Sequence, residues 1–392
     1  MNARLNLMSP SFLADPYPAY AQLRAGAEAV PVDPGGMWAV TAFDRVVEVL
    51  KRPEAFSSEP SEHDRERLFE RAFGGANMIA SDNPTHDRLR GILHKRFTPA
   101  RMRSLAGRID ALCRELLDDV ADDPEFDLVS AFTVPLPVII ISELLGVERS
   151  RISDFKRWSN GLVAIINGAS GEAREQALAE VFELAGYLAA AADQRRAAAS
   201  DDLIGLLVAA EREPGRLSAG EVLSYCILLL AAGNETTTNL LGGLTAALAA
   251  NPDQLERLER DPALIEHAVE EGLRYCSPVQ GLFRRVRVDT RLGDTTIPAG
   301  SRVWVSYGAA NHDPDRFAEP DRFDIGRDCR GHVGFGWGLH FCLGSHLART
   351  EARVALTHLV PLLRRAELKT PVPWLPSWVV RGPQALLIRR VA

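Results

Sequence analysis

The stretch Gly334–Gly344, GFGWGLHFCLG, places one cysteine among four glycines and three aromatic residues. Glycine at this density is typical of a backbone that turns sharply or approaches another group closely. The helical pattern of Gly344–Leu363 follows at once, so Cys342 is expected at a helix N-terminus, where backbone N–H groups and the helix dipole favour a negative sulfur. A buried free cysteine is the alternative, but this setting favours a thiolate that ligates a metal.

Composition excludes several classes of protein. The 392 residues are 46% hydrophobic and 25% charged, which is typical of a globular chain, and the net charge of −7 argues against a nucleic-acid partner. The five cysteines are odd in number and never form CxxC. This pattern argues against a disulfide framework and a structural zinc site and excludes covalent haem attachment through CxxCH, and a reducing cytoplasm is the expected compartment.

One segment has the length of a membrane span. Cys226–Ala250 is long enough to cross a bilayer, but its middle, GNETTTN, carries a carboxylate, two amides and three hydroxyls. We therefore expect a helix buried inside the protein, with no membrane insertion. The N-terminal residues lack the continuous apolar core of a signal peptide.

Helical patterns dominate the chain. The helix expected at Ser218–Ala250 opens with a capping box, SAGE, and would run about 45–50 Å, so it should be the central helix. Further helices are expected at Pro99–Val120, Ser130–Leu145, Glu172–Ala199, Pro262–Tyr275 and Gly344–Leu363.

Strand patterns are confined to short stretches. Ala29–Val40 predicts a hairpin, Arg284–Tyr307 predicts short strands with turns, and ALLIRRV predicts a strand near the end of the chain. No linker-like segment divides the sequence. The prediction is a single domain of residues 1–392, mainly α with small accessory β-sheets.

The cysteine stretch resembles the haem-ligand loop of cytochromes P450, whose pattern is F-x-x-G-x-x-x-C-x-G. Phe335, Gly338, Cys342 and Gly344 fill its four fixed positions. The resemblance covers essentially the whole chain. It implies the cytochrome P450 fold, with haem b held non-covalently between the long central helix and the cysteine loop, and Cys342 as thiolate axial ligand.

Two helical motifs extend the resemblance. Glu271 and Arg274, in VEEGLRYCSP, could be an ordinary i,i+3 ion pair. The resemblance implies a buried structural pair, joined by a second arginine from FAEPDRFDIGR, which we assign to Arg322. AAGNETTTN resembles the oxygen-activation motif: Thr236 would hold the bound oxygen and its water, Glu235 would relay protons, and Ala232 would lie over the haem. Gly233 favours a local kink or groove, and a helix cap or a polar stripe is the alternative for this motif.

Cations for the haem propionates are also implied. His86 and Arg90 lie at i,i+4 in DNPTHDRLRGILHKRF, and His340 precedes the ligand by two residues. Arg284 is favoured over Arg285 as the arginine from the strand. Each of these residues alone could be a surface charge. Trp337 and His312 depart from the family pattern, which has polar residues and arginine respectively at these positions.

Electrons must come from outside, because the sequence has no flavin or nicotinamide fingerprint. The resemblance implies a ferredoxin and an NAD(P)H-driven ferredoxin reductase. Arg88–Arg103 has six Lys or Arg and no acidic residue, so it is either a docking patch for an acidic partner or a solvated basic face. The protein is expected to be a monomer.

The substrate pocket implied by the resemblance is mostly apolar. Its residues are Leu228, Ala231, Gln280, Leu282, Phe283, Val379 and Val380, together with Ala232. Such a pocket suits a bulky lipophilic molecule, such as a terpenoid, steroid, fatty acid or polyketide. The contribution of Ser57–Met78 is not assigned.

The sequence thus predicts a haem-thiolate monooxygenase that inserts one atom of O2 into its substrate. The alternatives are a peroxide-driven peroxygenase, a haem-thiolate isomerase and a non-enzymatic haem sensor or carrier. The Glu235–Thr236 pair argues against the first two, and the lack of a signalling domain argues against a sensor.

Overall fold

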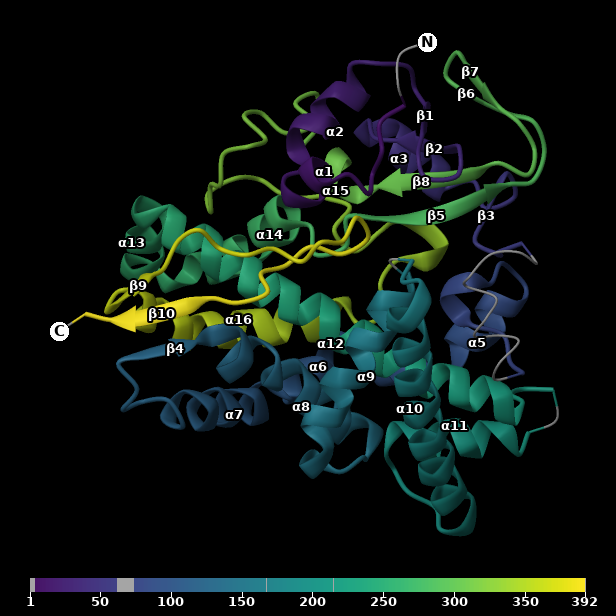
Figure 1. The fold of residues 1–392 in the computed structure, drawn as a ribbon. Coiled ribbons are helices and arrows are strands. Elements are labelled where there is room, and N and C mark those ends of the chain that lie inside the picture. Colours follow the sequence, from purple (N-terminus) through teal and green to yellow (C-terminus); the bar gives the residue numbers. More distant parts are fainter. Residues whose placement is uncertain (1–3, 62–73, 167, 214, 392) are drawn as a thin grey trace. The chain divides into compact units, whose positions relative to one another are not determined.

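The computed structural model describes residues 4–61, 74–166, 168–213 and 215–391 (Figure 1). The chain forms two compact units. The first unit comprises Met1–Ser57, Met102–Thr133 and Thr236–Ala392, and the second comprises Ser58–Arg101 and Val134–Glu235. The single domain expected from the sequence stays a prediction.

The second unit is helical. Helix α9 packs against α8 and α10, and α11 packs against both α8 and α10. Helix α8, PLPVIIISELL, is apolar on nearly all sides, and most of its side chains are buried accordingly. The α-helices of the second unit are α5 (Thr85–Leu93), α8 (Pro135–Leu145), α9 (Ile152–Ile166), α10 (Gly171–Ala197) and α11 (Leu203–Glu211), with the first part of α12 (Ala219–Ala250).

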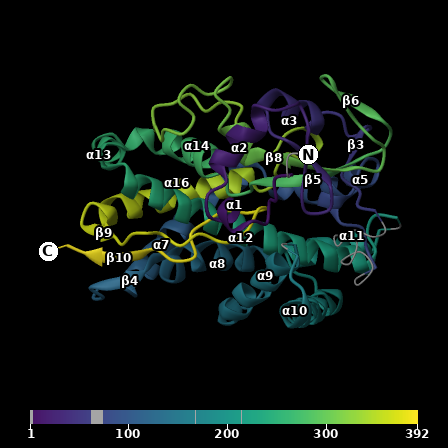
Figure 2. The same cartoon turned by 45° about the horizontal axis from the view of Figure 1, so that its top comes forward.

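The first unit also contains several helices. Helix α16 lies beside α14 in both ribbon views and also contacts α7 and α13 (Figures 1 and 2). The helices of this unit are α1 (Pro10–Ala14), α2 (Tyr17–Arg24), α3 (Phe43–Leu50), α7 (Ala106–Asp118), α13 (Pro252–Arg260), α14 (Ile265–Cys276), α15 (Tyr307–Asn311) and α16 (Ser345–Leu363), with the rest of α12.

The main sheet of the first unit has the order β1-β2-β8-β5-β3. Strands β2 and β8 pair in parallel, and the other pairs are antiparallel. Its strands are β1 (Val30–Val32), β2 (Met37–Val40), β3 (Phe56–Ser57), β5 (Gly281–Val286) and β8 (Arg302–Ser306). A second sheet joins β4 (Glu125–Asp127), β10 (Leu387–Arg390) and β9 (Ala366–Leu368), and β6 (Thr290–Leu292) pairs with β7 (Thr295–Ile297).

Strand β8 lies between two hydrophobic clusters. Val303 and Val305 belong to a cluster with Val40 and Tyr307, whereas Trp304 belongs to one on the opposite face. This follows from the two-residue period of a strand. Because both faces of β8 are covered, its sequence is a nearly continuous apolar run. The strand occupies the central position of the sheet.

The predicted mainly helical fold with small sheets is confirmed. The hairpin within Ala29–Val40 forms as β1 and β2. The helix expected at Pro99–Val120 is instead two helices, α6 (Pro99–Ser104) and α7, separated at Leu105. The parallel pairing of β2 with β8 joins residues more than 250 positions apart and has no local signature.

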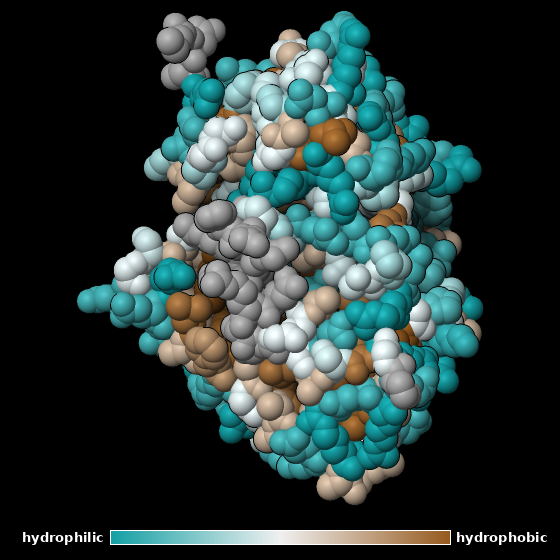
Figure 3. Space-filling view, turned by 90° about the vertical axis from the view of Figure 1, so that its right-hand side faces the viewer, coloured by the Kyte–Doolittle hydropathy of each residue, from teal (hydrophilic) through white to brown (hydrophobic). Residues whose placement is uncertain are grey.

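Within the described residues, no helix has an apolar stretch long enough to cross a membrane. Helix α12 fails this criterion because of the polar residues at its centre. The face in Figure 3 is mainly hydrophilic, with hydrophobic residues exposed in small groups.

One buried carboxyl makes the stability of the first unit depend on pH. Glu351 of α16 is 1% exposed. Burial raises the pKa of Glu351 to about 8, although a hydrogen bond with Thr237 of α12 acts in the opposite direction. The folded protein therefore keeps this carboxyl protonated at neutral pH, whereas in the unfolded chain it ionises near the ordinary glutamate pKa of 4.5.

We expect the free energy of unfolding to fall as pH rises from 4.5 to 8, because only the unfolded state then releases this proton. The slope should be about 1.4 kcal/mol per pH unit. Glu351→Gln keeps the shape of the side chain and should remove this contribution. Urea unfolding of the wild-type and Glu351→Gln holoproteins across this pH range measures the contribution. The prediction is wrong if the free energies of unfolding of the two proteins change with pH in parallel.

Candidate functional site

The Cys342 loop is held by its own backbone. The N–H of Cys342 donates to the carbonyl of Phe335 at 3.0 Å, and helix α16 begins three residues later at Ser345. Gly336 and Gly338 have φ of 69° and 68°, the left-handed region that favours glycine. A Cβ on Gly338 would lie 2.7 Å from the Leu50 carbonyl, so the loop rests directly on the end of α3. Cys342 is half-buried, at a helix N-terminus that favours a thiolate.

Aromatic residues pack along this loop. The ring of Phe335 contacts those of His332 and Phe341, and the Arg349 guanidinium lies 4.6 Å from its centroid. Trp337, which the family pattern does not explain, packs against the cluster that contains Leu50. The Lys51 ammonium lies 5.6 Å from the Trp337 ring. Trp337 thus holds the loop to the end of α3.

Arg284 of β5 has the properties expected of a propionate-binding residue. Its side chain is 7% exposed and hydrogen-bonds to the carbonyl of Phe283 and to Tyr307. No carboxylate among the described residues pairs with it. A buried cation without an anion fits a negatively charged ligand group. Arg285 instead donates to the Gly300 carbonyl, and His340 lies half-buried in the short helix Gly338–His340.

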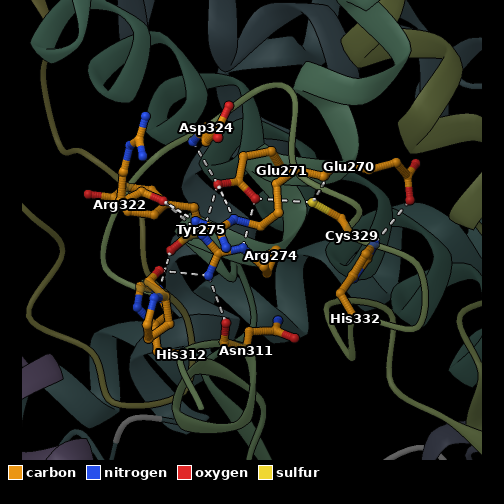
Figure 4. A network of polar contacts seen from close by, with 12 residues as sticks. Glu270, Glu271, Arg274, Tyr275, Asn311, His312, Arg322, Asp324, Cys329 and His332 are labelled. Carbon is orange, nitrogen blue, oxygen red and sulfur yellow. Dashed lines mark hydrogen bonds and ion pairs between the residues drawn. The ribbon is translucent and has the colours of Figure 1, made fainter. Parts of the chain in front are cut away.

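Figure 4 shows the polar network around Glu271. Arg274 donates to both oxygens of Glu271, at 2.7 and 2.8 Å, and both side chains are fully buried. The predicted buried pair is present. Arg274 also donates to the carbonyls of Asn311 and Pro320. These hydrogen bonds hold two points of the segment that leads to the cysteine loop.

The second arginine of this network is Arg327, so the assignment to Arg322 is wrong. Arg327 Nε lies 3.3 Å from Glu271, whereas the Arg322 side chain is 57% exposed and pairs with Glu319. The N–H of Arg322 closes a turn onto the carbonyl of Glu319, and its own carbonyl accepts from Arg274. That turn directs the Arg322 side chain outward and its carbonyl inward.

The sequence did not reveal two further members of this region. Cys329 Sγ lies 3.1 Å from Glu271, and burial raises the pKa of this thiol. His312 is buried, contacts the rings of Tyr17 and Tyr275, and bonds through its two nitrogens to Asp321 and to the Tyr275 carbonyl. The departure at His312 is therefore accommodated by polar partners on both sides of the ring.

The oxygen-activation motif lies in α12. In the second unit, Glu235 is buried and forms an ion pair with Lys156 of α9, whose Nζ is 2.8 Å away. A Cβ on Gly233 would lie 3.2 Å from Ile141 of α8, so this glycine allows close helix packing. Helix α12 is continuous through Gly233.

One stripe of α12 is less buried than its surroundings. Leu228, Ala231 and Thr236 are half-buried and Ala232 is exposed, although this part of the helix is otherwise largely buried. Their spacing of three, four and eight positions from Leu228 places them on one face of the helix. That face is the one expected to meet a ligand.

Helix α5 of the second unit carries His86 and Arg90. His86 is 1% exposed, and burial lowers its pKa, although the hydrogen bond with Asp87 acts in the opposite direction. His86 is therefore suited to donate a hydrogen bond as a neutral ring rather than to act as a cation. Arg90 is half-buried one turn further along the helix.

Two residues assigned to the substrate pocket have other contacts. The Gln280 amide accepts from Tyr20 and donates to the Ser277 carbonyl, so it is engaged inside the first unit. Phe283 packs against Trp378, with the Arg302 guanidinium 3.8 Å from its ring centroid. Because strand side chains alternate, Phe283 faces away from the side that carries Leu282 and Arg284. The substrate roles of Gln280 and Phe283 stay predictions, and Phe283 packs on the same hydrophobic cluster as Val379 and Val380.

Leu282, Val379 and Val380 remain together. The backbone of Gln280 bonds to Val379, and Val279 forms a bridge with Val380, so the C-terminal segment lies beside β5. Part of the Ser57–Met78 loop, residues 62–73, lies outside the described residues.

Comparison with known proteins gives consistent matches. The family model described as Cytochrome P450 matches residues 34–376. The 6-deoxyerythronolide B hydroxylase of Saccharopolyspora erythraea is 37% identical, covering 98% of both chains, and the vitamin D(3) 25-hydroxylase of Pseudonocardia autotrophica is 39% identical, covering 90% of this chain and 88% of its own. The structure of myxobacterial cytochrome P450 CYP267B1 in complex with myristic acid superposes with a TM-score of 0.92 at 36% identity, covering 98% of this chain and 99% of that one.

The corrected arginine can be tested by substitution. Arg327→Ala removes a partner of the buried Glu271 and should lower the free energy of unfolding by about 2–3 kcal/mol. Arg322→Ala, the matched control, removes an exposed side chain and should change it by less than about 0.5 kcal/mol. Urea unfolding measures both values, and equal losses would restore the original assignment.

Proposed function

This chain belongs to the bacterial-type cytochrome P450 family and is an enzyme of that family, and on this premise we propose that it inserts one atom of O2 into a bulky lipophilic substrate, with Cys342 as the ligand of haem b. The observation that carries the proposal is the glycine-turned loop that presents a half-buried Cys342 at the start of a 19-residue helix. Arg284, a buried cation in the same unit without a carboxylate partner among the described residues, supports it.

The residues divide into three tasks. Cys342 would ligate the iron as a thiolate, with Phe335, Gly338 and Gly344 shaping the loop around it. Arg284, His340, Arg90 and the neutral His86 would bind the two propionates through charge-assisted hydrogen bonds. A bound haem would supply the iron that binds and reduces O2. Glu235 and Thr236 would then deliver the protons that O–O cleavage consumes.

Proton delivery is supported by the pairing of Glu235. Its carboxylate is buried, yet its partner Lys156 is 28% exposed, so the pair connects the interior of α12 to solvent within the second unit. Thr236, the next residue, lies in the less buried stripe. Its hydroxyl can both donate to a bound oxygen and accept from a water, which a proton relay requires.

The proposed electron donors are a ferredoxin and its NAD(P)H-driven reductase. Within Arg88–Arg103, Arg88 pairs with Glu221 and Arg96 with Asp201, whereas Lys95 is exposed. Lys95 is thus a better candidate than Arg96 for contact with an acidic partner. A cytoplasmic location and a monomeric state remain predictions from the sequence.

A lipophilic substrate is supported by the apolar side chains among the predicted substrate residues. On α12 these are Leu228 and two alanines, and within the first unit they are Leu282, Val379 and Val380. These are apolar, and the alanines leave room for a bulky molecule. Relatives are named for 6-deoxyerythronolide B and vitamin D(3), and a similar structure holds myristic acid, so polyketides, steroids and fatty acids are the first compounds to screen.

The ligand assignment is tested by the spectrum of the reduced protein with CO. The wild-type holoprotein should show the strongly red-shifted Soret band of a thiolate ligand, and Cys342→Ala should lose it. Cys113→Ala, at a fully buried cysteine in α7, is the matched control and should keep the band. Retention by Cys342→Ala would mean that another residue ligates the iron.

Thr236→Ala separates an oxygenase from the alternative functions. With a surrogate ferredoxin and reductase, this variant should bind haem and consume NADPH but release more than half of the electrons as hydrogen peroxide, because the hydroxyl no longer assists proton delivery. Product, peroxide and NADPH are measured together. Full coupling to product would refute the role of Thr236, and a wild-type protein that turns over with peroxide alone would be a peroxygenase.

A further inference from the structure

Glu270 stands beside the motif residue Glu271 but serves a different region. Successive residues of a helix point about 100° apart, so the two carboxylates leave α14 in different directions (Figure 4). Glu271 bonds to Arg274 and Arg327, as described above. Glu270 accepts from Arg349 Nε and Nη2 at 2.6 and 2.9 Å, and its other partner is His332 Nε2 at 3.0 Å.

The two partners of Glu270 flank the Cys342 loop. His332 precedes the loop and Arg349 lies in the second turn of α16 behind it. His332 Nδ1 accepts the N–H of Gly334 at 3.0 Å, so Nε2 must carry the proton that is donated to Glu270. The Glu270 carboxylate therefore holds a residue just before the Cys342 loop and a residue just after it.

The same carboxylate balances a cation close to the ligand. The Arg349 guanidinium lies 4.6 Å from the ring centroid of Phe335, and the Phe335 carbonyl accepts the N–H of Cys342. Burial would raise the pKa of Glu270, but the hydrogen bonds from Arg349 and His332 outweigh it and lower the pKa to about 2. Glu270 is thus an anion at every working pH, and the Glu270–Arg349 pair has no net charge.

We propose that Glu270 is a positioning residue that anchors the Cys342 loop at both ends and, by neutralising Arg349, sets the electrostatic potential at the Cys342 sulfur. This inference rests on the proposed function, since it takes Cys342 as the iron ligand. The proposal predicts the sign of each shift in the haem potential. Removal of the Glu270 anion and removal of the Arg349 cation must shift the potential in opposite directions.

The test is the midpoint potential of the haem in substrate-free holoprotein. Glu270→Gln leaves Arg349 unbalanced and should favour the reduced iron, raising the reduction equilibrium constant about three- to tenfold, where tenfold is 59 mV for one electron. Arg349→Gln leaves Glu270 unbalanced and should lower it by a similar factor. The double variant should return close to the wild-type value.

A matched control lies one helical turn away on the same two helices. Glu266 pairs with Arg353 at 2.7 Å, so Glu266→Gln removes the same kind of contact between α14 and α16 further from Cys342. It should leave the potential within twofold of wild type. Equal shifts in this control, or shifts of the same sign in Glu270→Gln and Arg349→Gln, would overturn the proposal.

Two further outcomes are decisive. If Glu270→Gln loses haem while the double variant keeps it, the unbalanced cation is the cause and the electrostatic role stands; loss of haem by both variants would support the anchoring role and overturn the electrostatic one. A wild-type protein without the thiolate Soret band would refute the proposed function itself, whereas a normal band with unchanged potentials in all variants would refute only the role of Glu270.

Discussion

The structure of the first unit depends on the fully buried ion pair of Glu271 and Arg274. Two charges out of water are tolerable only when their remaining donors and acceptors are also satisfied. The chain supplies those partners from one segment: Arg327 and the Asp324 N–H reach Glu271, and backbone carbonyls reach Arg274. The path of the backbone between Asn311 and Cys329 follows from this requirement, and that path delivers the cysteine loop.

The loop itself is defined by close backbone approach on one side and a carboxylate on the other. Gly338 rests on the Leu50 carbonyl, and Trp337 packs beside it, so the loop cannot move toward α3. Glu270 bonds to His332 before the loop and to Arg349 after it. Adjacent glutamates of one helix therefore hold neighbouring parts of the same segment, and both act through arginines whose planar donors match a carboxylate.

Helix α12 shows how a reactive surface is kept within an apolar helix. Most of its leucines are buried, and two of its polar residues pair with α9: Glu235 bonds to Lys156 and Asn234 to Ser159. The stripe with Ala231, Ala232 and Thr236 is less buried than most of the helix. The small side chains of this stripe leave space for a ligand, while the paired residues behind it keep the helix anchored to α9.

The sequence by itself determined the helical fold, the cysteine loop and the positions of Glu271, Arg274, Glu235 and Thr236. The helices and the glycine-rich loop are local patterns, because glycine spacing, helical period and capping act between near neighbours, whereas the four site residues were identified through the resemblance to cytochromes P450. Only the tertiary structure decided that Arg327 replaces Arg322, that Gln280 bonds to Tyr20, and that Lys156 pairs with Glu235. Those choices depend on which segments meet in space, and a turn or a strand register that inverts a side chain leaves no distinct mark in the sequence.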